Sequence, residues 1–194
     1  IGKRSRQATQ LVLQEEALVN INEAVVNRFT TQFGFPKDRS VNKVVNAMSD
    51  VVKEFIRQSP FCILATSDSE GNCDASPKGG RKGFVAVLDD RHIIVPDTAG
   101  NKLFQTYLNM ESNPHVGIVF LIPGSNDTVR VNGRISILTK ADLDQLNIEL
   151  SVNFHDNNTL NLQGIMVEVE EAFTHCPRAF KFADLWNEDE ISKQ

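Results

Sequence analysis

The chain has 194 residues, 41% of them hydrophobic, with a net charge of −5 and a pI near 5.4. These values predict a single soluble domain with appendages, and the acidic balance argues against binding nucleic acid through a broad positive surface. No apolar run reaches the roughly 20 residues that cross a bilayer, and no secretory signal opens the chain. We therefore expect a cytoplasmic protein that has no membrane partner.

The first part of the chain has helical periodicity. Apolar residues recur at helical spacing over residues 7–31, which contain neither Gly nor Pro. After a break at residues 34–40, the pattern resumes over residues 41–58 and ends at Ser59-Pro60. We expect a helical arm over residues 1–40 and a domain over residues 41–194. The apolar stripes of these helices are typical of a core-covering face, although a partner-binding arm would show the same pattern.

The pattern changes to that of strands at Phe61. Successive segments predict a hairpin over 61–77, a second hairpin over 83–96 that turns at Asp89-Asp90, strands over 115–123 and 128–139, a helix over 141–152, a loop over 155–164, a strand over 165–175 and a short helix over 177–186. Only one helix is inserted among the later strands, and no Gly-x-Gly-x-x-Gly turn is present. The order predicts a mainly β protein with flanking α-helices, built as an antiparallel barrel.

The segment VPDTAGNK (Val95–Lys102) lies between a predicted strand and a predicted helix. If Asn101 and Lys102 open that helix after a turn at Gly100, unpaired backbone N–H groups and a lysine ammonium converge on one point. Such a point suits a phosphate. The alternative is that Thr98, Gly100 and Asn101 only cap the helix while Lys102 is solvated.

A second basic segment, SPKGGRKGF (Ser76–Phe84), joins two predicted strands. It carries Lys78, Arg81 and Lys82 among three glycines, which allow backbone to approach a ligand closely. Three cations would complement a phosphate ester. The segment does not match a P-loop, and a solvated basic loop would have the same composition.

Two further segments hold candidate residues. Arg130 and Asn132 share one face of the strand over 128–139, and the Asn132 amide can both donate to and accept from a heterocycle edge; a solvated outer face is the alternative. In HCPRAF (His175–Phe180), Pro177 fits a first helical position and places Cys176 beside a helix N-terminus. His175 is badly placed to act as a base for Cys176, because adjacent strand residues face opposite ways. Arg178 is a candidate ligand contact.

The three cysteines and four histidines predict neither a disulfide framework nor a metal site. The cysteines are odd in number and widely spaced, so we expect free thiols. The histidines never fall at i, i+3 or i, i+4, the spacing at which a helix presents two ligands to one metal. We therefore assign no metal and name no catalytic residue.

Taken in order, the segments SPFCILATSDSEGNCDASPKGG, GFVAVLDDRHIIVPDTAGNKLFQTYLNMESNPHVGIVFLIPG, RVNGRISI and HCPRAF resemble the pyridoxamine 5'-phosphate oxidase-like flavoproteins of the FMN-binding split-barrel superfamily. The resemblance covers roughly residues 44–186. It implies a six-stranded antiparallel split β-barrel with N-terminal helices and a short C-terminal helix. It also implies a homodimer with FMN at the subunit interface, and flavin redox chemistry on a small-molecule substrate.

The resemblance also implies roles for individual segments. Residues 98–102 match the grip on the flavin phosphate, and residues 74–78 match a strand beside the isoalloxazine ring. Residues 130–132 match a strand near the partner's flavin, and residues 175–178 a segment near the ring or substrate. Together with the basic loop, the candidate cofactor-binding residues are Asp74, Ser76, Lys78, Arg81, Thr98, Gly100, Asn101, Lys102, Arg130, Asn132, His175, Cys176 and Arg178.

Two departures from the family pattern bear on the substrate. True pyridoxamine phosphate oxidases carry an Arg-Lys pair where this chain has Asn101-Lys102, and their C-terminal Trp and Arg pattern is not reproduced. We therefore do not expect oxidation of pyridoxamine phosphate. The main hypothesis is an FMN-dependent oxidoreductase. The alternatives are a non-catalytic flavin or haem binding or sensing module, a deazaflavin-dependent reductase, and an interaction protein built on the N-terminal helix.

Overall fold

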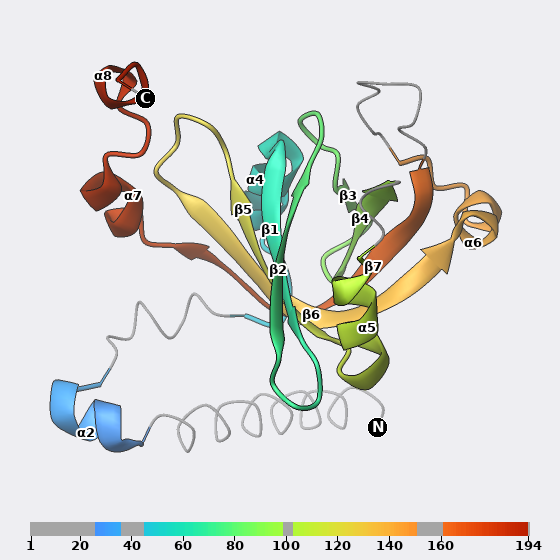
Figure 1. Ribbon diagram of the computed structural model, residues 1–194, viewed down its shortest axis with the longest axis horizontal. Coiled ribbons are helices and arrows are strands. Elements are labelled where there is room, and N and C mark those ends of the chain that lie inside the picture. The colour runs from blue at the N-terminus through green and yellow to red at the C-terminus, as the bar shows by residue number, and fades with distance from the viewer. Residues whose placement is uncertain (1–25, 36–44, 99–102, 151–160, 194) are drawn as a thin grey trace, which may run out of the picture. The chain divides into compact units, whose positions relative to one another are not determined.

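Figure 1 shows the computed structural model of the chain, which describes residues 26–35, 45–98, 103–150 and 161–193. The chain divides into two compact units, Ile1–Asn42 and Lys43–Gln194. In the first unit, helix α2 (Arg28–Phe33) begins after Asn27, whose side chain accepts from the N–H groups of Phe29 and Thr30. The predicted helix over 7–31 is wrong at Asn27, where the backbone is extended. Residues 7–25 lie outside the described residues.

The second unit contains all of the described strands. Its elements in chain order are α4 (Asp50–Gln58), β1 (Phe61–Ser67), β2 (Cys73–Gly79), β3 (Ala86–Val87), β4 (His92–Thr98), α5 (Gln105–Ser112), β5 (His115–Leu121), β6 (Thr128–Thr139), α6 (Lys140–Gln145), β7 (Asn161–His175), α7 (Arg178–Ala183) and α8 (Glu188–Ile191). None of the helices in the described ranges is long and apolar enough to cross a membrane.

The strands form one sheet in the order β2-β1-β5-β6-β7-β4-β3, and every pair is antiparallel. The sheet curls along its length (Figure 1), and its edge strands β2 and β3 do not pair with each other. Six strands have seven residues or more, while β3 has two. The predicted six-stranded antiparallel split barrel is therefore confirmed, with β3 as a short seventh strand.

Alternating side chains give the sheet one buried face. In β1 the buried residues are Cys62, Leu64 and Thr66, and in β5 they are Val116, Ile118 and Phe120. Helix α4 adds its apolar stripe, Val52 and Ile56, to the same core. The period-2 pattern of the strands and the period-3.6 pattern of the helix thus meet on one side of the sheet.

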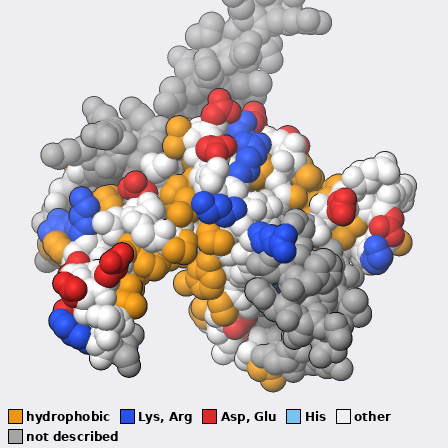
Figure 2. Space-filling model, turned by 90° about the horizontal axis from the view of Figure 1, so that it is seen from above, with side chains coloured by type: hydrophobic (Ala, Val, Ile, Leu, Met, Phe, Trp, Pro, Cys, Tyr) orange, Lys and Arg blue, Asp and Glu red, His pale blue; other side chains and the backbone are white. Residues whose placement is uncertain are grey.

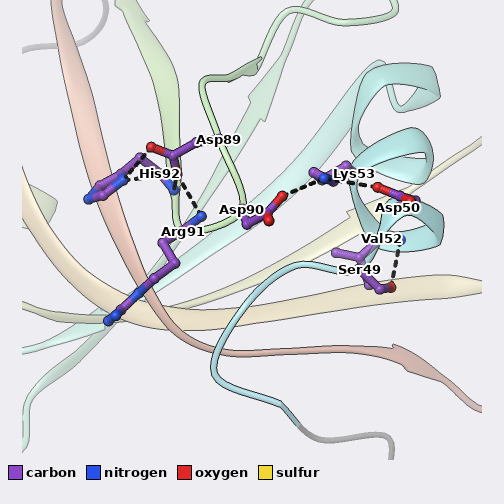
Figure 3. A network of polar contacts seen from close by, with 8 residues as sticks. All are labelled: Ser49, Asp50, Val52, Lys53, Asp89, Asp90, Arg91 and His92. Carbon is purple, nitrogen blue, oxygen red and sulfur yellow. Dashed lines mark hydrogen bonds and ion pairs between the residues drawn. The ribbon is translucent and has the colours of Figure 1, made fainter. Parts of the chain in front are cut away.

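Helix α4 begins later than the sequence predicts. Helical periodicity starts at Val41, but Val45 forms an isolated bridge with Ala172, and the Met48 N–H donates to the Asp90 carbonyl at 2.7 Å. The helix begins only after Ser49, which accepts from the Val52 N–H (Figure 3). Hydrogen bonds to β7 and to the β3–β4 turn have replaced helical hydrogen bonds over residues 45–48, which local periodicity does not reveal.

The turn between β3 and β4 forms where the sequence predicts it, and it is tied to α4. Lys53 contacts Asp50 at 2.9 Å and also the Asp90 carboxylate (Figure 3). The hydrogen bonds to these two carboxylates raise the pKa of Lys53, and the bond to Asp90 has the larger effect. Asp89 accepts from the N–H groups of Arg91 and His92, and the Arg91 N–H bond lowers the pKa of Asp89. The second predicted hairpin is confirmed.

Three other boundaries differ from expectation. Helix α6 ends at Gln145, although the sequence predicts helix to Val152; residues 151 and 152 lie outside the described residues. Strand β7 begins at Asn161, inside the predicted loop over 155–164, because its first residues pair with β4 and β6. The C-terminal helix α7 stops at Ala183, where Asp184 takes a left-handed conformation.

Candidate functional site

Strand β2 places three candidate residues on one face of the sheet. Asp74, Ser76 and Lys78 are half-buried, while the residues between them are exposed. They lie opposite Thr66, Leu64 and Cys62 of β1, so they point to the core side of the sheet. The regular alternation of a strand therefore brings two of the predicted polar contacts, Ser76 and Lys78, to the same side as Asp74.

Lys78 meets a carboxylate from a distant strand. Its Nζ lies 3.3 Å from Oδ1 of Asp97 in β4, and the two side chains are only 19% and 10% exposed. Strands β2 and β4 are separated in the sheet by four other strands, so the curl of the sheet brings them together. The other Asp97 oxygen lies 3.5 Å from Nε2 of Gln163 in β7. A half-buried cation thus sits beside the end of β4.

Helix α5 covers this polar cluster. Thr106 donates to Asp74 at 2.8 Å, and Asn109 donates to Thr66 at 3.0 Å. Tyr107 follows Thr106 in the same helix, and its buried hydroxyl has no hydrogen-bond partner of normal geometry among the described residues. Burial and the nearby Asp97 carboxylate raise the pKa of Tyr107, although Gln163 acts in the opposite sense. The hydroxyl keeps its proton at neutral pH and stays a donor.

The predicted phosphate loop is only partly described. Thr98 ends β4, with a register shift between Asp97 and Thr98. Gly100, Asn101 and Lys102 lie outside the described residues. The described part of the following helix, α5, begins at Gln105 after Phe104, whose φ of 56° is left-handed. A bulky residue in that conformation interrupts the helical backbone.

The basic segment over 76–84 is divided by the fold. Lys78 points to the core side, whereas Arg81 and Lys82 are exposed on the loop after β2. This loop is tight, since a Cβ on Gly80 would overlap the Phe84 side chain. In the view of Figure 2, basic side chains lie at several separate places on this face, with acidic and apolar side chains among them. Of the three predicted cations, Lys78 is thus half-buried on the core side, and Arg81 and Lys82 are exposed on the loop.

Arg130 and Asn132 lie on the other face of the sheet. The Arg130 guanidinium lies 5.6 Å from the ring centroid of Phe173, and Nδ2 of Asn132 donates to the Glu171 carboxylate. Their strand neighbours Val129 and Val131 are fully buried in the core. The prediction that Arg130 and Asn132 share the face away from the core is confirmed. Within one chain, the sheet separates them from Lys78.

The same outer face is mostly small and apolar across the neighbouring strands. Ala75, Ala65 and Gly117 form one cross-strand row that continues to Asn132, and Pro77, Ile63 and Val119 form the row that continues to Arg130. Ile63 is 39% exposed. A hollow of about 460 Å³ opens here, lined by Ala65, Thr66, Ser67, Cys73, Asp74, Ala75, His115, Val116 and Gly117. An exposed apolar face of this kind is typical of an interface.

The C-terminal candidates lie where β7 ends. His175 and Cys176 are exposed, and the His175 ring lies 6.2 Å from that of Phe173. Arg178 opens α7 and stacks on the ring of Phe182 at 4.8 Å. The segment is held to the domain by the Trp186 indole, which donates to the Ser125 carbonyl at 2.8 Å.

Cys62 is chemically different from the other two cysteines. Burial raises its pKa from 9.0 to about 12, although Lys78 acts in the opposite sense. We expect iodoacetamide at pH 8 to leave Cys62 unmodified in the folded protein, since the thiolate is the reactive form. The exposed Cys73 and Cys176 serve as internal controls, and unfolding in guanidinium should make Cys62 react too. Mass spectrometry of digested peptides measures this, and rapid native labelling of Cys62 would contradict it.

Sequence reasoning missed the partners that the fold brings to the candidate residues. Asp97 lies inside the motif that drew attention to the loop, but its partner Lys78 is 19 positions away and no local pattern joins them. Tyr107, Gln163 and Glu171 were missed for the same reason. One signal in the sequence could have identified Asp97. It is a charged residue within the otherwise apolar strand HIIVPDT, where a buried charge needs a partner.

The described residues hold no group of three or more His, Cys, Asp or Glu arranged for a metal ion. Fold and site together define a split-barrel protein with a half-buried lysine at the sheet edge and an apolar outer face. The sequence profile of the pyridoxamine 5'-phosphate oxidase family matches residues 48–176. The chain belongs to that family.

Several solved structures are similar to this chain. HupZ of Group A Streptococcus is 20% identical, with 66% of this chain and 93% of that one covered and a TM-score of 0.47. A protein from Lactobacillus delbrueckii, named for pyridoxamine 5'-phosphate oxidase, is 21% identical, with 66% and 95% covered and a TM-score of 0.49. A pyridoxamine 5'-phosphate oxidase-related, FMN binding protein from Nostoc punctiforme is 12% identical, with 64% and 81% covered and a TM-score of 0.43. No curated protein sequence matches this chain.

Proposed function

We propose that this chain is an FMN-binding protein that acts as a homodimeric, FMN-dependent oxidoreductase on a small molecule. Family membership supports flavin binding of some kind. The observation that carries the choice of a phosphorylated flavin is the position of Lys78. Its ammonium is half-buried on β2 and lies 3.3 Å from Asp97, one residue before Thr98. The two segments that the sequence predicts as phosphate-binding thus approach each other at Lys78.

The described residues fit a phosphate ester at this point. Lys78 offers three N–H donors, and the pairing with Asp97 does not use them all. We propose that Lys78 and Thr98, together with Gly100, Asn101 and Lys102, hold the phosphate. We propose Asp74 and Ser76 as neighbours of the ring along β2, and Arg81 as a contact at the rim. The flavin supplies the redox chemistry when bound, while the chain binds, orients and shields it.

We propose that a second copy of the chain completes the site. Arg130 and Asn132 face away from Lys78, so one chain cannot bring all of the candidate residues to one ligand. A two-fold dimer through the apolar outer face would place Arg130, Asn132, and the His175, Cys176 and Arg178 segment of one subunit near the flavin of the other. Such an isologous interface requires one self-complementary patch. In this proposal residues 41–194 form the flavin domain, and residues 1–40 form an arm outside it.

Titration with FMN and with riboflavin tests the proposal. We expect the full chain to bind FMN and to quench its fluorescence. Lys78→Ala should weaken FMN binding about ten- to a hundredfold, since a charge-assisted hydrogen bond contributes about 1.5–3 kcal/mol. Lys140→Ala, which removes an exposed lysine of α6, is the matched control. A chain that binds neither flavin, or a Lys78→Ala variant with unchanged FMN affinity, contradicts the proposal.

Turnover separates an enzyme from a carrier. We expect the FMN-loaded dimer to oxidise NADH or NADPH under oxygen. The decrease in absorbance of the reduced nicotinamide measures this reaction. Deleting residues 1–31 should leave FMN bound and turnover intact. Loss of activity with FMN still bound would favour an interaction protein built on the N-terminal helix, and absence of turnover in the full chain would favour a non-catalytic flavin module.

A further inference from the structure

The Asp97 carboxylate lies beside Lys78, the residue that the proposed function assigns to the flavin phosphate. Its side chain is only 10% exposed, with Lys78 Nζ at 3.3 Å from one oxygen and Gln163 Nε2 at 3.5 Å from the other. A buried carboxylate is tolerated because of such partners. The Lys78 ammonium therefore already has an anionic partner before any ligand arrives.

An anion that binds Lys78 must compete with this carboxylate. A phosphate oxygen in contact with an ammonium lies about 2.8 Å from its nitrogen. With Lys78 at 3.3 Å from Asp97, the two anions would be no more than about 6 Å apart. A phosphate ester carries about −1.5 to −2 charges, so one lysine cannot neutralise both groups. Like charges at this separation repel appreciably where water is largely excluded.

Tyr107 offers the carboxylate another partner. Its buried hydroxyl makes no hydrogen bond of normal geometry to a described residue, and it lies near enough to Asp97 for that carboxylate to help raise the pKa of Tyr107. A buried hydroxyl without a partner is costly and uncommon, so its position calls for a reason. Rotation of the Asp97 side chain away from Lys78 and toward Tyr107 would let the carboxylate accept from this hydroxyl.

We infer that Asp97 holds Lys78 while the site lacks an anion, and that Tyr107 takes over the carboxylate when Lys78 turns to a phosphate. Asp97 and Tyr107 are then positioning residues that act through Lys78. Asp97 weakens the binding of phosphorylated flavin, and Tyr107 partly relieves that effect. The inference rests on the proposed function, and it concerns selectivity between FMN and riboflavin, which differ only in the phosphate.

The first test is Asp97→Asn in the full chain, with FMN and riboflavin each titrated by fluorescence quenching. We expect the FMN dissociation constant to fall about tenfold or more, because a like charge is removed. The riboflavin constant should not change, and this also reports that the variant is folded. Glu168→Gln is the matched control, since it removes one negative charge from an exposed side chain. An unchanged ratio of the two constants in Asp97→Asn overturns the inference.

The second test is Tyr107→Phe, alone and combined with Asp97→Asn. Alone, it should weaken FMN binding about three- to tenfold, because the displaced carboxylate loses its donor. In the Asp97→Asn background it should have little effect, since no carboxylate needs the hydroxyl. If Tyr107→Phe weakens FMN binding by the same factor in the unmodified chain and in Asp97→Asn, the inference is overturned. If every variant binds FMN with the same selectivity over riboflavin, only this inference is contradicted. If the unmodified chain binds neither flavin, the proposed function is contradicted as well.

Discussion

Replacing Gly133 with alanine should destabilise the domain by about 3 kcal/mol, the largest effect expected of any single methyl group here. Gly133 is buried in β6, at the register shift between β6 and β7. A Cβ at this position would overlap the backbone carbonyl oxygen of Glu168, far inside van der Waals contact. A backbone oxygen cannot rotate away as a side chain can, so the two longest strands would have to separate.

Urea unfolding followed by circular dichroism measures this effect as a shift of the midpoint. Gly79→Ala is the matched control, because its Cβ would meet its nearest atom, the Pro60 carbonyl oxygen, at 3.4 Å. That variant should change stability by less than about 0.5 kcal/mol. Similar midpoint shifts for Gly133→Ala and Gly79→Ala would contradict the close approach of β6 and β7.

Ile63→Asp should convert the proposed dimer to monomer. Ile63 is 39% exposed in the centre of the apolar outer face, beside Pro77 and Val119 in register. A second copy packed there would bury the new carboxylate without a partner, which costs several kcal/mol. The dimer dissociation constant should therefore rise at least about a hundredfold.

Sedimentation equilibrium or light scattering over a range of concentrations measures the dissociation constant. Leu146→Asp makes the same kind of change at an exposed position after α6, away from the outer face, and should leave the dimer intact. FMN affinity should fall along with the dimer in Ile63→Asp, because two chains contribute to the proposed site. A stable Ile63→Asp dimer, or full FMN affinity in a monomer, would contradict the proposed interface.

The strands were the most predictable part of this protein. Alternation of apolar and polar residues is local, so it located β1, β2, β5 and β6 and the turn at Asp89-Asp90 from the sequence alone. It also showed that Arg130 and Asn132 share a face. The start of helix α4 and the start of strand β7 were less predictable, because residues 45–48 and 161–164 follow hydrogen bonds to distant parts of the chain in place of their local pattern.

By itself, the sequence determined the secondary structure of the sheet, the family and the chemical character of each candidate residue, since these depend on neighbours along the chain. Only the tertiary structure decided which candidates meet. The curl of the sheet brings Lys78 to Asp97 across four intervening strands, and Tyr107 is buried beside them by α5. The same sheet turns Arg130 and Asn132 away. Such contacts depend on how a whole sheet bends, and no local spacing of residues encodes that bend.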